Sequence, residues 1–292
     1  MKFLDQADTL AHAASAKVDI ITPHITDGTH MEVPWPLPPF FREVTLPRSD
    51  ALVFGPFDMN LTKHVVMLLL GATLLIITML LVARAHRRAT ASGAAPKGGT
   101  NAIEAMILYI RNDVILPNVG HHGEGFVPYL LTAFFFILVL NLLGLVPYGS
   151  TATGNISVTA MLAIMTFITV EVAGLRTHGV GYLKTMFYWN NDLPMIMRPI
   201  LFVVMSPVEI IGKFIKPFAL AIRLFANMTA GHIVVLALVG LIFSFGSYWM
   251  AVVPVGAAMM IKLLELFVAF LQAFIFTLLS AVFIGQIREG AH

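Results

Sequence analysis

Residues 216–245 read KPFALAIRLFANMTAGHIVVLALVGLIFSF, an apolar run that carries Arg223, Asn227 and His232. From Pro217 onward the run would form a helix of about 43 Å, whereas the hydrocarbon core of a bilayer measures about 30 Å. We therefore expect this helix to tilt strongly, to kink or to extend past the membrane. Arginine keeps its proton, and a guanidinium at bilayer depth costs roughly 2.5 to 3.5 kcal/mol. Arg223 is therefore predicted to serve a function.

The composition is that of a polytopic membrane protein. Of the 292 residues, 58% are hydrophobic and 12% are charged, which disfavours a soluble domain. The absence of cysteine excludes a disulfide framework and thiolate chemistry. The sequence also lacks the Gly-x-x-x-x-Gly-Lys-Ser/Thr phosphate-binding loop, so ATP chemistry is expected to belong to partner proteins. We predict an all-α polytopic membrane protein with five transmembrane helices and one amphipathic surface helix.

Charge and turn residues divide the chain into four parts. Residues 1–60 are acidic and interrupted by prolines, which predicts a partly ordered, extracytoplasmic N-terminal extension without a signal or transit peptide. Residues 61–88 are expected to form the first transmembrane helix, which ends at Ala83 and is followed by a basic inner end on the cytoplasmic side. Residues 89–125 should provide a flexible linker and a surface helix, and residues 126–290 a four-helix core.

The linker region contains two further candidate features. Residues 101–116 show apolar side chains at helical spacing, which predicts an amphipathic helix that lies on the inner membrane surface or docks on protein. His121 and His122 are adjacent in a glycine-rich loop, and two neighbouring histidines could indicate a metal site. Because further ligands at a suitable spacing are lacking, we favour an ordinary polar turn and predict no metal.

Three more stretches complete the hydrophobic pattern. Residues 126–147, 155–174 and 251–287 are each long and apolar enough to cross a bilayer. With basic residues on the cytoplasmic side, this order places the N-terminus outside and the C-terminus in the cytoplasm. The apolar segment 199–207 is bounded by prolines and is predicted to be too short to span.

Charged residues mark the inner side of these spans. Glu171 lies near the inner end of the third span and is predicted to be an exposed, interfacial carboxylate. Glu209 and Lys213 stand four residues apart and are predicted to pair where the fourth span begins.

The last two spans are expected to form a long tilted hairpin, in which polar residues meet at two depths. Counting back from a turn near residue 248 places Gln272 opposite Arg223 and Glu265 opposite His232. The two levels are separated by about 11 to 14 Å along the helices. Glu265 and Gln272 are one heptad apart and therefore share a side of their helix. Histidine titrates near neutral pH, so His232 and Glu265 are predicted to relay protons as one coupled unit.

Two other interpretations of His232 and Glu265 remain open. His232 and Glu265 could be a buried pair that only fixes the hairpin, as polar side chains do between membrane helices. Alternatively, Lys262 stands one turn before Glu265 and could neutralise it.

Asn227 lies one turn from Arg223 on the same side of its helix, so these two residues form a second polar group.

Two motifs carry a family resemblance. The first is AIRLFANMTAGH at 221–232 together with LQAFIF at 271–276, and the second combines FVP at 126–128 with NLLGLVP at 141–147. These motifs resemble subunit a of the membrane (Fo) sector of the F-type ATP synthase. The resemblance covers roughly residues 101–290 and leaves the N-terminal extension without a match.

The resemblance implies a stator channel beside a rotating ring of c subunits, with residues 126–290 as the proton-channel core. Protons would enter from outside through one half-channel, ride on a ring carboxylate and leave through a second, offset half-channel to the cytoplasm. Arg223 corresponds to the essential arginine that faces the c ring and blocks a direct leak. The family's polar inlet path corresponds to Asn227, His232, Glu265 and Gln272. Many bacterial members carry the acid and the histidine in exchanged positions, and this chain resembles mitochondrial-type members there.

The resemblance also implies partners and a location. Besides the c ring, it implies the b-subunit peripheral stalk, the F1 sector indirectly and the lipid bilayer, with neither a cofactor nor nucleic acid. ATP catalysis would belong to other subunits, and the missing transit peptide favours a bacterial plasma membrane. A secondary proton antiporter would instead show two homologous halves or broken helices, and the sequence contains no such repeat. A purely structural membrane anchor would leave the charge of Arg223 unexplained.

Overall fold

The computed structural model describes most of the chain, in two compact units. The described residues are 27–34, 41–47, 53–54, 57–58, 60–93, 98–120, 123–146, 151–182, 197–245 and 252–289. The first unit comprises Met1–Lys63 and Thr229–Leu264, and the second comprises His64–Met228 and Glu265–His292. Five helices in the described part of the chain are long and apolar enough to cross a membrane, which confirms the predicted all-α polytopic class.

The first unit contains two short antiparallel strand pairs that the sequence did not predict. Strand β1 (His30–Pro34) pairs with β2 (Phe41–Thr45), and β3 (Val53–Phe54) pairs with β4 (Phe57–Asp58). The proline that stops helix formation is compatible with this arrangement, because Pro34 stands at the end of its strand. The N-terminal extension therefore includes ordered, paired strands rather than only a tail.

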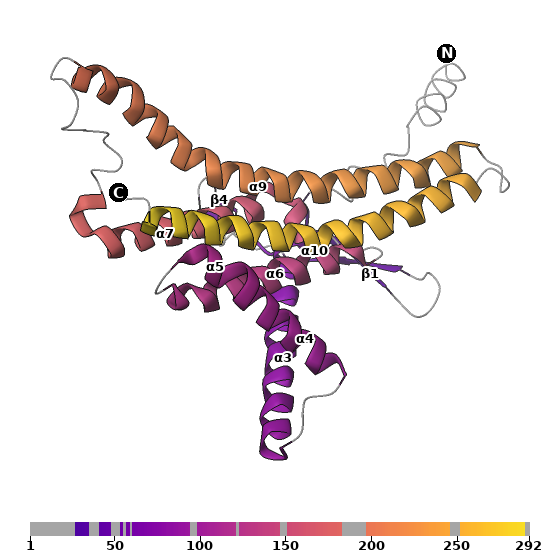
Figure 1. The fold of residues 1–292 in the computed structure, drawn as a ribbon. Coiled ribbons are helices and arrows are strands. Elements are labelled where there is room, and N and C mark those ends of the chain that lie inside the picture. The colour runs from indigo at the N-terminus through magenta and orange to yellow at the C-terminus, as the bar shows by residue number, and fades with distance from the viewer. Residues whose placement is uncertain are drawn as a thin grey trace, which may run out of the picture. The chain divides into compact units, whose positions relative to one another are not determined.

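Helix α3 (Lys63–Ala91) is longer than predicted. It was expected to end at Ala83, but it continues through the basic cluster, because alanine and arginine are good helix formers. Figure 1 shows α3 projecting away from the other helices of the second unit, with α4 (Gly99–Tyr109) beside its far end. There His86 Nδ1 and Glu104 Oε2 are 3.2 Å apart.

The predicted surface helix docks on protein through its second half. Helix α4 continues into a π-helical turn, η2 (Ile110–Ile115), and then into α5 (Leu116–Val119). The buried side chains of this segment are those of Ile110, Val114, Ile115 and Val119, which join the hydrophobic core, whereas α4 itself contributes no fully buried residue. Of the two alternatives, docking on protein therefore holds for η2 and α5.

Helix α6 lies at the centre of the second unit. A short turn, η3 (Glu124–Phe126), leads into α6 (Val127–Leu145), and η4 (Ala152–Gly154) connects the chain to α7 (Ile156–His178) and then η5 (Gly179–Gly181). The side chain of Asn155 accepts a 2.9 Å hydrogen bond from the Ser157 amide and so caps α7. Phe134 is fully buried and makes edge-to-face contacts with Phe135 and Phe270.

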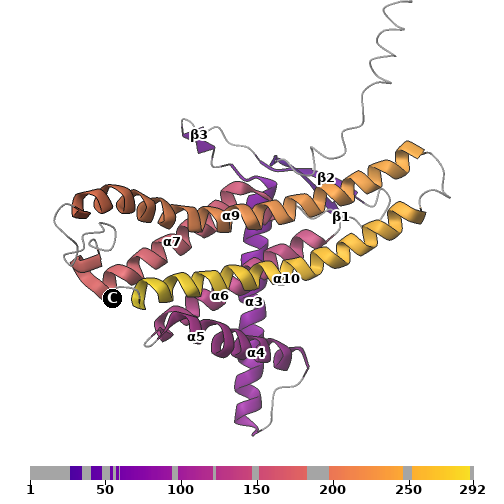
Figure 2. The ribbon, with the colours of Figure 1, turned by 45° about the horizontal axis from the view of Figure 1, so that its top comes forward.

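Helix α9 (Met197–Phe245) corrects the prediction for 199–207. That segment was predicted to be too short to span, but it is part of α9, which runs continuously over 49 residues with Pro207 and Pro217 inside it. Membrane helices tolerate internal prolines, since neighbouring groups satisfy the freed carbonyls. Helix α10 (Val252–Glu289) follows, and both views show its second-unit part beside that of α9 (Figures 1 and 2). The predicted hairpin turn near residue 248 lies outside the described residues.

Gly285 allows α10 to approach the C-terminal end of α5 closely. A Cβ atom there would overlap the backbone oxygen of Asn118, and one turn later Arg288 Nη1 donates a 2.9 Å hydrogen bond to the Val119 oxygen. We predict that Gly285→Ala destabilises the fold by about 1 to 3 kcal/mol and lowers the amount of chain retained in membranes. The measurement is thermal resistance of the detergent-extracted protein. Gly256→Ala, in open space on the same helix, is the matched control and should be neutral or stabilising.

Candidate functional site

Arg223 and Gln272 meet as the hairpin register predicts. Gln272 is 3% exposed, and its Nε2 atom donates a 2.9 Å hydrogen bond to the backbone oxygen of Arg223. On the same stretch of α9, the side chains of Leu220 and Leu224 are buried in the hydrophobic core. The guanidinium itself belongs to an exposed residue. The structure thus fixes the backbone that carries Arg223 and leaves its side chain on the outer face of α9.

The outer face of α9 is an exposed apolar stripe. Its members recur at spacings of three and four residues, as one face of a helix requires, and Phe218 is 65% exposed. The stripe consists of Val208, Ile211, Ile215, Phe218 and Ile222. Arg223 and Asn227 follow this stripe and are exposed as well. Such a face fits lipid or a protein partner, and the permanent charge of Arg223 beside it calls for an anionic partner.

His232 and Glu265, which the hairpin register predicts to lie at one depth, belong to different units. Glu265 is 4% exposed and belongs to the second unit, whereas His232 is half-buried and belongs to the first. Their relative position is therefore not described, and their coupling stays a prediction, as does a role for Lys262. Glu265 and Gln272 are both buried, as expected for residues one heptad apart on the same side of α10.

A second buried polar group, around Asn141, was not predicted from the sequence. Asn141 is fully buried in α6, where its Nδ2 atom donates to the Ala269 oxygen at 3.2 Å. Thr153 Oγ1 donates in turn to Asn141 Oδ1 at 2.8 Å. Ala269 stands between Glu265 and Gln272 on α10, so Asn141 supports the helix that carries both residues. An amide within an apolar span was the signal that could have identified it.

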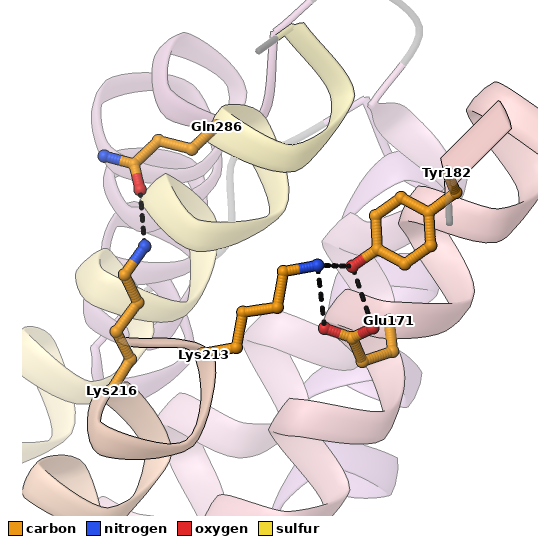
Figure 3. A network of polar contacts seen from close by, with 5 residues as sticks. All are labelled: Glu171, Tyr182, Lys213, Lys216 and Gln286. Carbon is orange, nitrogen blue, oxygen red and sulfur yellow. Dashed lines mark hydrogen bonds and ion pairs between the residues drawn. The ribbon is translucent and has the colours of Figure 1, made fainter. Parts of the chain in front are cut away.

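A charged cluster links α7 to α9 and corrects two predictions (Figure 3). Lys213 Nζ donates to the Tyr182 hydroxyl at 2.8 Å, and that hydroxyl donates to Glu171 Oε2 at 2.8 Å. Lys213 Nζ also lies 3.9 Å from Glu171 Oε1. Glu171 is therefore not an exposed interfacial carboxylate, because its side chain is only 18% exposed. Lys213 turns to these residues rather than pairing with Glu209.

The environment of Tyr182 favours its neutral form. Burial raises the pKa of this phenol well above its usual range, and the hydrogen bond to Glu171 acts in the same direction. Lys213 Nζ lies 4.2 Å from the centre of the phenol ring, a cation–π contact. Nearby, Lys216 Nζ donates to Gln286 Oε1 of α10 at 3.3 Å (Figure 3).

A cavity of about 50 Å³ lies beside this cluster, between α7, α9 and α10. Its polar lining is formed by Thr166, Glu171, Glu209, Lys213 and Lys216, and its apolar lining includes Pro217, Leu220 and Phe283. The volume is sufficient for about one or two water molecules, and the polar groups offer them hydrogen bonds. Along α9 the lining extends from Glu209 to Leu220, which stands one turn before Arg223.

No group of three or more histidines or carboxylates with metal-binding geometry occurs among the described residues. The adjacent histidines His121 and His122 fall outside those residues, so their prediction as a polar turn stays untested.

Comparisons with known proteins match most of the chain. The ATP synthase A chain family matches residues 65–285. ATP synthase subunit a of Chloroherpeton thalassium is 48% identical over 270 residues, which cover 92% of this chain and 76% of that protein. ATP synthase subunit a 2 of Prosthecochloris aestuarii is 49% identical over 284 residues, covering 96% and 83%. The subunit a 2 of Chlorobaculum tepidum is 47% identical over 281 residues, covering 96% and 75%.

Proposed function

Because this chain belongs to the ATP synthase A chain family, we propose that it is the proton-translocating stator subunit a of an F-type ATP synthase. It forms two offset half-channels beside a ring of c subunits and couples proton flow to ring rotation. The observation that carries this proposal is the position of Arg223 at the end of an exposed apolar stripe on α9, with its backbone held by buried Gln272. A ring helix with a membrane carboxylate is the partner that this face fits.

The site residues take distinct roles in this proposal. Arg223 attracts the deprotonated ring carboxylate and prevents protons from passing directly between the half-channels. The inlet path contains Asn227, His232, Glu265 and Gln272. The cavity that extends from Glu209 to Leu220 is a candidate for part of the path to the cytoplasm, because it approaches Arg223 from the charged start of α9. One charge that crosses 100 mV releases about 2.3 kcal/mol, so several protons must pass for each ATP.

The remaining assignments concern the complex. The subunit catalyses no ATP chemistry itself and contacts the b-subunit peripheral stalk and, indirectly, the F1 sector. It resides in a bacterial plasma membrane, with an extracytoplasmic extension (1–60) and a cytoplasmic C-terminus. The basic residues that follow the predicted spans support this orientation.

A cysteine cross-link tests whether the α9 stripe faces the ring. The chain contains no cysteine, so a single introduced thiol has no background within it. We expect Ile222→Cys, on the exposed stripe, to form a disulfide with a cysteine scanned along the outer ring helix. The cross-link should stop coupled ATP hydrolysis, and a reductant should restore it, because a stator joined covalently to the rotor prevents rotation.

Leu224→Cys is the matched control, since Leu224 is buried and should not react. The absence of a cross-link from Ile222→Cys at every ring position, or a cross-link that leaves coupled hydrolysis unchanged, would contradict the proposed interface.

A further inference from the structure

We propose that Glu171, Tyr182 and Lys213 form a positioning clamp, which sets the axial position and rotation of α9 against α7 and thereby places Arg223. This proposal rests on the proposed function, in which the location of the guanidinium relative to the ring matters. Figure 3 shows the three side chains converging from α7, from the residue that follows η5, and from α9.

The clamp consists of two directional hydrogen bonds that share one hydroxyl group. The Tyr182 hydroxyl accepts a hydrogen bond from Lys213 Nζ and donates one to Glu171 Oε2, both at 2.8 Å. Both bonds involve an ionisable partner, and such bonds are shorter and stronger than neutral ones when that partner is charged. Lys213 is only 9% exposed, so solvent does not replace these contacts easily. One hydroxyl thus connects the carboxylate of one helix to the ammonium of another.

Apolar packing alone would hold α9 less precisely. In a membrane, lipid tails are as apolar as leucine side chains, so packing resists sliding or rotation of a helix weakly. The outer stripe of α9 is uniformly apolar and provides no register of its own. Directional hydrogen bonds do provide one. Arg223 lies ten residues beyond Lys213, about 15 Å along the helix, so a change of register at Lys213 moves the guanidinium.

Two more bonds connect α9 to α10. Lys216 Nζ reaches Gln286 of α10, and Gln272 of α10 reaches the backbone oxygen of Arg223. The clamp adds a connection from α9 to α7. Helix α9 is therefore located between two neighbours, and loss of the clamp leaves the bonds to α10 to set its position.

The test removes the bridging hydroxyl with Tyr182→Phe and the ammonium with Lys213→Met, in the complete complex in inverted membrane vesicles. We expect retained complex and ATP hydrolysis, with acidification per ATP hydrolysed lowered about threefold or more. A role in folding alone would lower retained complex and pumping in parallel, and would leave this ratio unchanged. Tyr109→Phe is the matched control, because Tyr109 is an exposed tyrosine far from the clamp in sequence.

Exchange of the charges gives a second readout. Glu171→Lys alone should uncouple the complex, and the double variant Glu171→Lys with Lys213→Glu should restore a substantial part of coupling, because Tyr182 can bridge in either direction. An unchanged ratio in Tyr182→Phe and Lys213→Met, or a parallel loss of complex and pumping, would overturn the clamp. Arg223→Lys in the same vesicles separates the two proposals. If Arg223→Lys abolishes pumping while the clamp variants remain coupled, the result contradicts only the clamp. If Arg223→Lys pumps normally, the result contradicts the proposed function on which the clamp rests.

Discussion

A complex that carries Arg223→Lys is expected to assemble normally and to lose ATP-driven proton pumping by about tenfold or more. Lysine keeps the positive charge but replaces a planar, multi-donor guanidinium with a strongly hydrated point charge on a flexible stem. The backbone at this position is held by Gln272 through the Arg223 oxygen, a bond that the substitution leaves in place. The loss therefore reports on the side chain rather than on the helix. The measurement is quenching of a pH-sensitive dye in inverted membrane vesicles.

The matched control for this substitution is Arg111→Lys. Arg111 lies in η2, where its guanidinium approaches Asn112 at 3.4 Å, and it lies outside the proposed path. Pumping by Arg111→Lys should stay near the wild-type rate. Wild-type pumping by assembled Arg223→Lys would refute Arg223 as the barrier and would return the antiporter and anchor interpretations to consideration.

The second large effect is expected from Glu265→Gln, which should reduce pumping by at least about tenfold, since a positioned acid or base typically accelerates proton transfer by about 10² to 10⁴. Glutamine keeps the size and polarity of the buried side chain but does not titrate. If His232 and Glu265 only fixed the hairpin, the complex that carries Glu265→Gln should assemble and pump almost normally. The measurement compares pumping rate with the amount of complex in the same membranes.

Glu265→Asp provides a titrating comparison, and Glu124→Gln, at an exposed carboxylate, provides the matched control. We expect partial pumping from the first and full pumping from the second. Equal, near-normal rates in Glu265→Gln and Glu124→Gln would assign the Glu265 carboxylate a structural role only.

The sequence predicted those features that depend on periodicity and length. Five apolar stretches predicted five candidate spans, and counting from the hairpin turn placed Gln272 beside the backbone of Arg223. Both inferences need only the helical rise and the heptad. The functional roles proposed for Arg223, Asn227, His232, Glu265 and Gln272 came from charges in an apolar run and from the family resemblance.

The missed features depend on contacts between distant segments. Glu171 and Lys213 meet through Tyr182, and pairing within one helix made Glu209 the nearer candidate for Lys213. The prolines at 199 and 207 bounded a segment that was predicted to be too short to span, whereas α9 continues through Pro207. The β1–β2 pairing joins two segments whose partners sequence polarity alone does not specify.

The π-helical turn η2 restricts how the length of this segment can change. Deleting one of its residues would allow an ordinary α-helical turn, but it would rotate the residues on one side by about 100° relative to those on the other. The oxygens of Asn118 and Val119 would then no longer face Gly285 and Arg288 of α10. Homologous chains that retain this contact should therefore show substitutions between Tyr109 and Val119 more readily than insertions or deletions.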